Sequence, residues 1–120
     1  MVSMDLSTVV KDGHAVVGLR GELDVNDAAG VTVALADVVV GHPGIIIDLT
    51  ALDFIDCSGL WALTRAREQA GRAGGGLLLA AAPQQLVLQV LALTGLADVV
   101  PVHASVEQAE LAYAPRHRPV

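Results

Sequence analysis

Cysteine is almost absent from this sequence, and its scarcity excludes two common kinds of stabilising site. Cys57 is the only cysteine among 120 residues, so no intrachain disulfide can form and no Cys/His cluster has zinc-site spacing. The four histidines are scattered and match no metal-ligand spacing. We therefore expect a cytoplasmic protein without metal or cofactor, with its histidines on the surface.

Aromatic residues are also rare, at 2% of a chain that is 53% hydrophobic. The core must therefore be built from Val, Leu, Ile and Ala, a composition that suits a parallel sheet covered by helices. A chain of this length makes one ordinary domain. We accordingly expect a single domain over residues 1–120.

Positive charge is scarce as well. Lys and Arg total 7 against 13 Asp and Glu, a net charge of −6, which argues against a nucleic-acid partner. The first ten residues lack the basic and apolar regions of a signal peptide, and Gln89, Gly95 and Asp98 interrupt the apolar segment 86–100. We expect neither nucleic-acid binding nor membrane insertion.

The pattern of apolar residues predicts a hairpin followed by alternating helices and strands, which is an α/β fold with a mixed sheet and helices packed against it. Asp12-Gly13 is a typical two-residue hairpin turn, and Gly41 with Pro43, the glycines of 71–76 and Gly95 end helices. The expected strands are 8–10, 15–19, 45–47, 77–80 and an edge strand at 99–102. The expected helices are capped by Asn26 or Asp27, headed by Ser58, opened by Pro83, and placed at 107–113 before a frayed tail at 114–120. The apolar faces expected to pack are Ala28, Val31, Leu35, Val38 and Val39 in the first helix, Leu60, Leu63, Ala66 and Ala70 in the second, and Leu86, Val87, Val90 and Leu91 in the third.

The segment from Ile45 to Leu60 carries the strongest functional signal, because it delivers one hydroxyl from a buried strand to the start of a helix. Asp and Ser are favourable helix N-cap residues, and the unpaired N–H groups of a first turn favour an anion such as phosphate. Ser58 is therefore either an N-cap or a phosphorylation switch.

On the helix that follows, Ser58, Trp61, Arg65 and Glu68 share one stripe, whereas the aliphatic residues fall on other angles. Trp and Arg are enriched among binding hot spots. We interpret Trp61 and Arg65 as an exposed interface, with peripheral core as the alternative for Trp61.

Cys57 has two interpretations. A thiol at a helix N-terminus can become nucleophilic, but a cysteine-dependent phosphatase loop needs Arg six residues later, and position 63 is Leu. We therefore interpret Cys57 as a small packed residue and expect no catalytic residue, with a thiol enzyme as the alternative.

Three motifs resemble those of STAS-domain anti-sigma-factor antagonists. Residues 56–60, Asp-Cys-Ser-Gly-Leu, look like the family's phosphorylation-site signature, residues 21–24 like its Gly-Glu-Leu/Ile-Asp, and residues 93–96 like its small-Gly-Leu turn. They stand in the family's order and at about its spacing, so the resemblance covers roughly 5–113 and implies a STAS domain with that core. Cys57 replaces a commoner Ser, and Trp61 stands where a small residue is frequent, which would narrow the set of kinases accepted.

The resemblance implies an anti-sigma-factor antagonist that is not itself an enzyme. Unphosphorylated, it would bind an anti-sigma factor that is also a serine kinase and so release a sigma factor. Phosphorylation of Ser58 would end binding, and a serine phosphatase would restore it. A permanent, unphosphorylated STAS subunit of a transport or sensory assembly is the alternative.

The same resemblance names the contact residues, and each aspartate keeps a structural alternative. Asp24 and Asp56 would help the kinase engage the serine. The structural alternative for Asp24 is a turn residue that caps the first helix, and that for Asp56 is a helix-terminus carboxylate. The residues predicted to bind the partner are Asp24, Asp56, Gly59, Trp61 and Arg65.

Overall fold

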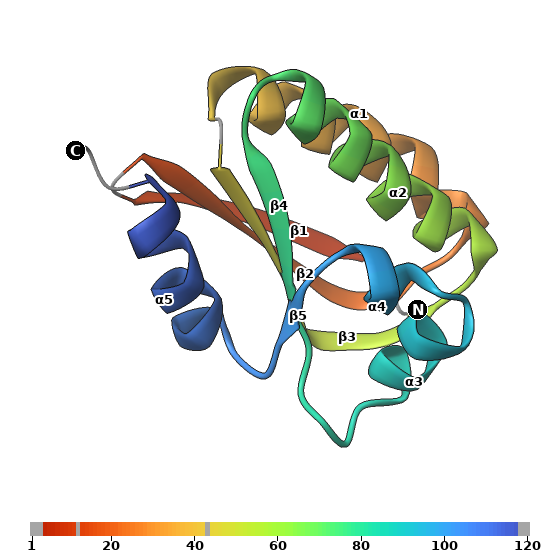
Figure 1. Cartoon of the computed structure of the whole chain (residues 1–120). Helices are drawn as coiled ribbons and strands as arrows, with labels where there is room; N and C mark the ends of the chain where they lie inside the picture. The colour runs from red at the N-terminus through yellow and green to blue at the C-terminus, as the bar shows by residue number, and fades with distance from the viewer. Residues whose placement is uncertain (1–3, 12, 43, 118–120) are drawn as a thin grey trace.

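The computed structural model describes residues 4–11, 13–42 and 44–117. Five strands and five helices are found in this part of the chain (Figure 1). The elements in chain order are β1 (Asp5–Lys11), β2 (His14–Leu23), α1 (Val25–Gly41), β3 (Gly44–Ile55), α2 (Cys57–Arg72), β4 (Gly76–Ala80), α3 (Leu86–Leu93), α4 (Leu96–Val99), β5 (Val102–His103) and α5 (Val106–His117).

The strands form one mixed sheet in the order β1-β2-β3-β4-β5. β1 is antiparallel to β2, with Lys11 opposite His14 across the hairpin, and the other neighbours are parallel. Gly13 closes this hairpin at φ +89°, a conformation that glycine adopts without strain. The expected α/β fold with a hairpin and a mixed sheet is confirmed, whereas Asp12 of the turn lies outside the described residues.

Helices cover both faces of the sheet, and the two sides are unequal. The larger core joins α1, α2, α3 and α4 to one face, and the smaller core joins α5 to the other face (Figure 1). Ile45 and Ile47 point into the large core and Ile46 into the small one, as the alternation of a strand requires. The all-apolar run of β3 is thus explained by burial on both sides.

Helix α5 is held to the sheet by polar contacts as well as by packing. The Tyr113 hydroxyl accepts the N–H of Ile45 at 2.7 Å and donates to the carbonyl of Gly76. Glu110 pairs with Lys11 at 3.3 Å and with His14 at 3.1 Å. The side chain of His14 is mostly buried against Glu110, so the prediction of a surface residue was wrong there. His42 and His103 are partly exposed.

Several predicted element boundaries were wrong. The cap of α1 is Asp24 rather than Asn26 or Asp27, because the chain turns directly after β2. α3 begins at Leu86, after Pro83, and its first turn leaves Leu86 exposed. Val99 belongs to the one-turn helix α4, so β5 starts only at Val102.

Other predicted boundaries agree more closely or cannot be compared. Strand 77–80 lies within β4, and α2 ends at Arg72, inside the glycine-rich stretch. α5 continues to His117, past the end expected at Tyr113. Pro43 lies outside the described residues.

None of the helices in the described ranges has both the length and the apolar character needed to cross a membrane.

Candidate functional site

The predicted site lies where two neighbouring parallel strands end. Leu23 of β2 is paired with Ile55 of β3, so the next residues, Asp24 and Asp56, leave the sheet at the same edge. The N–H of Asp56 donates to the carbonyl of Leu23 at 3.2 Å. Each aspartate then starts a helix, and α1 and α2 run side by side over the sheet (Figure 1).

Gln85 holds the second half of β3, beyond the residues that pair with β4. The side-chain amide of Gln85 donates to the carbonyls of Leu49 and Leu52, at 2.9 and 3.1 Å, and its side-chain oxygen accepts the N–H of Ala82. These bonds join the connection between β4 and α3 to the part of β3 that lies beyond its pairing with β4.

Asp56 is the N-cap of α2 and satisfies most of its first turn. Its carboxylate accepts the N–H groups of Ser58 at 2.9 Å and Gly59 at 3.2 Å, and its carbonyl accepts the N–H of Leu60 at 3.0 Å. Ser58 is therefore not the cap, because it lies two residues inside that position. The N–H groups of Ser58 and Gly59, which we expected to favour a phosphate, already have a carboxylate partner.

Asp24 has the same capping role at α1, where its carboxylate accepts the N–H of Asn26 at 3.0 Å. The structure thus brings Asp24, Asp56 and Ser58 to one edge of the molecule. Both aspartates have the structural role that was the alternative to kinase contact. Capping uses carboxylate lone pairs without removing the negative charge, so both aspartates keep the edge that carries Ser58 acidic.

Gly59 is buried beneath the start of α2. A Cβ atom at this position would lie 2.7 Å from a side-chain carbon of Ile55 and 2.8 Å from one of Leu23. Only glycine therefore lets the first turn of α2 approach the ends of β2 and β3 this closely. Gly59, predicted as a partner-binding residue, is buried directly after Ser58, and its lack of a side chain sets how closely this turn lies to the sheet.

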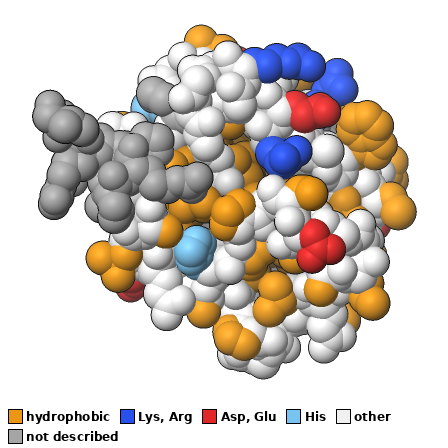
Figure 2. Space-filling view, viewed as in Figure 1, with side chains coloured by type: hydrophobic (Ala, Val, Ile, Leu, Met, Phe, Trp, Pro, Cys, Tyr) orange, Lys and Arg blue, Asp and Glu red, His pale blue; other side chains and the backbone are white. Residues whose placement is uncertain are grey.

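The outer face of α2 combines one aromatic residue with several charges. Trp61 is 63% exposed, and the Arg65 guanidinium carbon lies 5.8 Å from the centre of its ring. Arg67, Glu68 and Arg72 are exposed on the same helix. Figure 2 shows basic, acidic and hydrophobic side chains close together over this region. The predicted exposure of Trp61 and Arg65 is confirmed.

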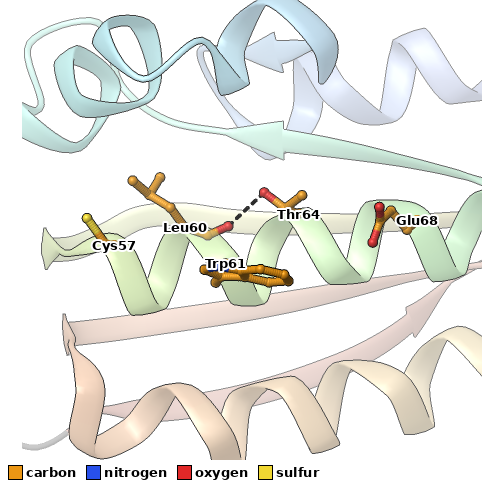
Figure 3. Close-up of a pocket in the computed structure, with 5 residues that line it drawn as sticks. All are labelled: Cys57, Leu60, Trp61, Thr64 and Glu68. Carbon is orange, nitrogen blue, oxygen red and sulfur yellow. Dashed lines mark hydrogen bonds between the residues drawn. The ribbon is translucent and has the colours of Figure 1, made fainter.

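Cys57 is exposed at the first position of α2, so the prediction that it is a packed residue was wrong. No described group is hydrogen-bonded to its thiol. Cys57 instead borders a surface groove of about 370 Å³ on α2 (Figure 3). The described residues lining the groove are Cys57, Leu60, Trp61, Thr64 and Glu68.

Sequence reasoning missed two exposed apolar residues near the same edge, Val25 and Phe54. Val25 opens α1 at 68% exposure, and Phe54, near the end of β3, is 43% exposed. Phe54 is paired with Glu22 just after a register shift between β2 and β3, which disturbs the simple alternation of the strand. The sequence offered one signal for such a residue, which is that the apolar Val25 directly follows Asp24.

The chemistry of this edge is that of a modifiable hydroxyl beside carboxylates. Among the described residues, no group of three His, Cys, Asp or Glu side chains could hold a metal ion. Ser58 lies in the first turn of α2, where its own N–H and that of Gly59 are already bonded to Asp56, and next to the exposed face that carries Trp61. The arrangement suits recognition by another protein.

The chain belongs to the STAS domain family, whose sequence profile matches residues 5–109. It is similar to the anti-sigma-F factor antagonist RsfB of Mycobacterium tuberculosis, with 32% identity over 71 residues. That match covers 58% of each protein, so the chain spans little more than half the length of this curated relative.

Two solved structures resemble the whole fold. One is an anti-sigma factor antagonist from Mycobacterium paratuberculosis, at 29% identity and a TM-score of 0.83, covering 92% of this chain and 93% of that one. The other is the Bacillus anti-sigma factor antagonist SpoIIAA in its unphosphorylated form, at 22% identity and a TM-score of 0.74, covering 98% and 99%. The predicted STAS fold is thereby confirmed.

Proposed function

We propose that this protein is an anti-sigma-factor antagonist that binds a serine-kinase anti-sigma factor while Ser58 is unphosphorylated, and so releases a sigma factor. The single observation that carries the proposal is the placement of Ser58 beside two capped helix starts and next to the exposed Trp61 face of α2. Similarity to proteins named as anti-sigma factor antagonists supports it. In this role the protein acts in the cytoplasm by binding and has no enzymatic activity of its own.

Phosphorylation of Ser58 would act as a local electrostatic switch. A phosphate adds roughly −1.5 to −2 charge beside the carboxylate of Asp56. Because Asp56 already accepts the N–H groups of Ser58 and Gly59, the phosphate gains little from the helix start and stays exposed to water. A partner that covers it must desolvate an uncompensated charge, which costs several kcal/mol.

Trp61 and Arg65 would be the main contacts with the partner. An exposed indole flanked by a guanidinium is the kind of residue pair found at binding hot spots. Asp24 and Asp56 would face the kinase's phosphorylation site, and Gly59 would set the height of Ser58 above the sheet. A serine phosphatase would return the protein to its binding form.

The test is to mix the purified protein with each purified kinase-type anti-sigma factor of its own organism. We expect one kinase to bind it, to transfer phosphate from ATP to Ser58, and to lose affinity for the product by about a hundredfold. Ser58→Ala should bind without being phosphorylated. Ser105→Ala, at the start of α5, is the matched control and should be phosphorylated like the wild type.

Failure of every kinase to bind would contradict the proposal. Binding without phosphorylation of Ser58, together with permanent retention in a larger complex from cells, would instead favour the transport or sensory subunit.

A further inference from the structure

The groove on α2 lies on one side of Trp61 only. In Figure 3, Leu60 and Thr64 point from α2 toward the side on which α3 and α4 lie, whereas α1 runs along the opposite side of α2. The Thr64 hydroxyl donates to the carbonyl of Leu60 at 2.9 Å, so this polar group is satisfied within the helix and needs no partner. The groove therefore presents an isobutyl group, an indole and a methyl group to a ligand.

Ser58 lies on the other side of Trp61. Successive residues of a helix are turned by about 100°, which puts Cys57, Leu60 and Thr64 about 40–100° to one side of Trp61 and Ser58 about 60° to the other. In agreement with this, Ser58 is absent from the residues that line the groove. A partner can therefore fill the groove without covering the hydroxyl.

Of the two charged side chains beside the groove, Arg65 has a contact within the protein and Glu68 forms no ion pair with a described residue. Arg65 lies over the Trp61 ring. Glu68, an exposed carboxylate that lines the groove, forms no ion pair with any described residue. The groove and the unpaired carboxylate are therefore complementary to a partner segment in which a Lys or Arg comes shortly after an apolar residue in the sequence.

We propose that this groove is the part of the docking surface that selects the partner: it receives an apolar side chain of the anti-sigma factor, and Glu68 pairs with a Lys or Arg that follows it. This inference rests on the proposed function and assigns separate roles, a division of labour, to the groove and to Ser58. The groove recognises which kinase binds, and Ser58 on the opposite side of Trp61 determines whether binding persists. The groove stays open in the phosphorylated protein.

The experiment uses the full chain and the kinase that binds and phosphorylates the wild type. Glu68→Lys should weaken binding by about tenfold or more, because a repulsive pair replaces an attractive one. Thr64→Phe should weaken it similarly by filling the groove. Glu107→Lys, an exposed carboxylate on α5, and Leu111→Ala, an exposed apolar residue there, are matched controls and should change the affinity less than about twofold.

A reciprocal substitution completes the test. A Lys→Glu or Arg→Glu change at the kinase residue facing Glu68 should restore affinity for Glu68→Lys and lower it for the wild type. Glu68→Lys and Ser58→Glu should have additive effects on binding free energy, because the two residues lie ten positions, or about 15 Å, apart along α2.

The outcomes separate the two proposals. If no kinase binds the wild type, the proposed function and the groove assignment are both wrong. If a kinase binds and phosphorylates Ser58 while Glu68→Lys and Thr64→Phe bind as tightly as the wild type, only the groove assignment is wrong. Strong coupling between Glu68→Lys and Ser58→Glu would overturn the division of labour.

Discussion

Helices α2 and α5 lie on opposite faces of one sheet and use their aromatic residues in opposite ways. α5 buries Tyr113, which is 2% exposed and hydrogen-bonded to the sheet. α2 packs with small residues, including Gly59, Ala62 and Ala66, and leaves Trp61 in solvent. The large aromatic side chain holds the fold together in one helix and remains available for a partner in the other.

The charges of the two helices differ in a similar way, except that Glu107 of α5 is exposed and forms no ion pair with any described residue. On α5, Glu110 is paired with Lys11 and His14 of the first hairpin. On α2, the three arginines and Glu68 form no ion pair with any described residue. Exposed charge without an internal partner, next to an exposed indole, marks the α2 face as the one suited to binding.

The largest predicted effects on stability and binding come from replacing Tyr113 and Trp61 by alanine, each in a separate variant. Tyr113→Ala should lower the free energy of unfolding by about 3–5 kcal/mol, because it leaves a cavity and removes the hydrogen bonds to the sheet. Trp61→Ala should change it by less than about 0.5 kcal/mol but reduce kinase binding at least tenfold. Urea denaturation and titration calorimetry measure the two effects. Equal losses of stability would contradict the division between the helices.

The next effect concerns the close approach of α2 to the sheet. Gly59→Ala should destabilise the protein by about 1–3 kcal/mol, because the added methyl group overlaps Ile55 and Leu23. Gly71→Ala, also in α2, is the matched control: its Cβ would meet nothing within 4 Å, so the change should be neutral or slightly stabilising. Thermal melts of both variants decide whether space or helix propensity governs the result.

The helix caps give an effect of intermediate size. Asp56→Ala should cost about 1 kcal/mol, because the N–H groups of Ser58 and Gly59 lose their acceptor. Asp56→Asn should keep most of the stability while removing the charge. If the carboxylate helps the kinase engage Ser58, the Asn variant will be phosphorylated more slowly than the wild type. An unchanged rate would leave Asp56 with the capping role alone.

The smallest effect is a pH dependence on the α5 side. Burial raises the pKa of Glu110, but the hydrogen bonds and charges of His14 and Lys11 outweigh it and lower that pKa below its ordinary 4.5. Because the folded-state pKa is lowered, the contribution of Glu110 to stability is present above pH 4.5 and is lost as the pH falls through that folded-state pKa.

Glu110→Gln should therefore cost up to about 1 kcal/mol at pH 7 and progressively less in acid. Denaturation curves at pH 7 and pH 3 provide the comparison, with Glu107→Gln on the same helix as control. A cost that grows as the pH falls would contradict this sign.

Much of the fold could be predicted from the sequence, because burial leaves a periodic pattern. The hairpin, the doubly buried Ile45 to Ile47 run and the buried faces of α1 and α2 all follow from such patterns. The first turns of helices were harder to place. Asp24 and Asp56 turned out to be the caps, because the pairing of Leu23 with Ile55 determines where β2 and β3 end.

The candidate site was predictable to a similar degree. The segment around Ser58 and the exposed Trp61 were apparent from motif and helical spacing. The groove was not, because the exposure of Cys57 and the arrangement of Leu60 and Thr64 depend on how α2 is rotated against the sheet. The whole buried face of α2 sets that rotation, and the close approach of Gly59 to Leu23 and Ile55 is one part of it.

The sequence by itself determined the fold class, the STAS resemblance and the position of Ser58 at the start of a helix, because these depend on local spacing and on which residues avoid water. Only the tertiary structure decided which aspartates cap the helices, that Cys57 is exposed, that Glu110 is paired and that the groove lies across Trp61 from Ser58. Those features arise from contacts between residues distant in the chain, whose geometry is set by the packing of helices on the sheet and not by the pattern of any one segment.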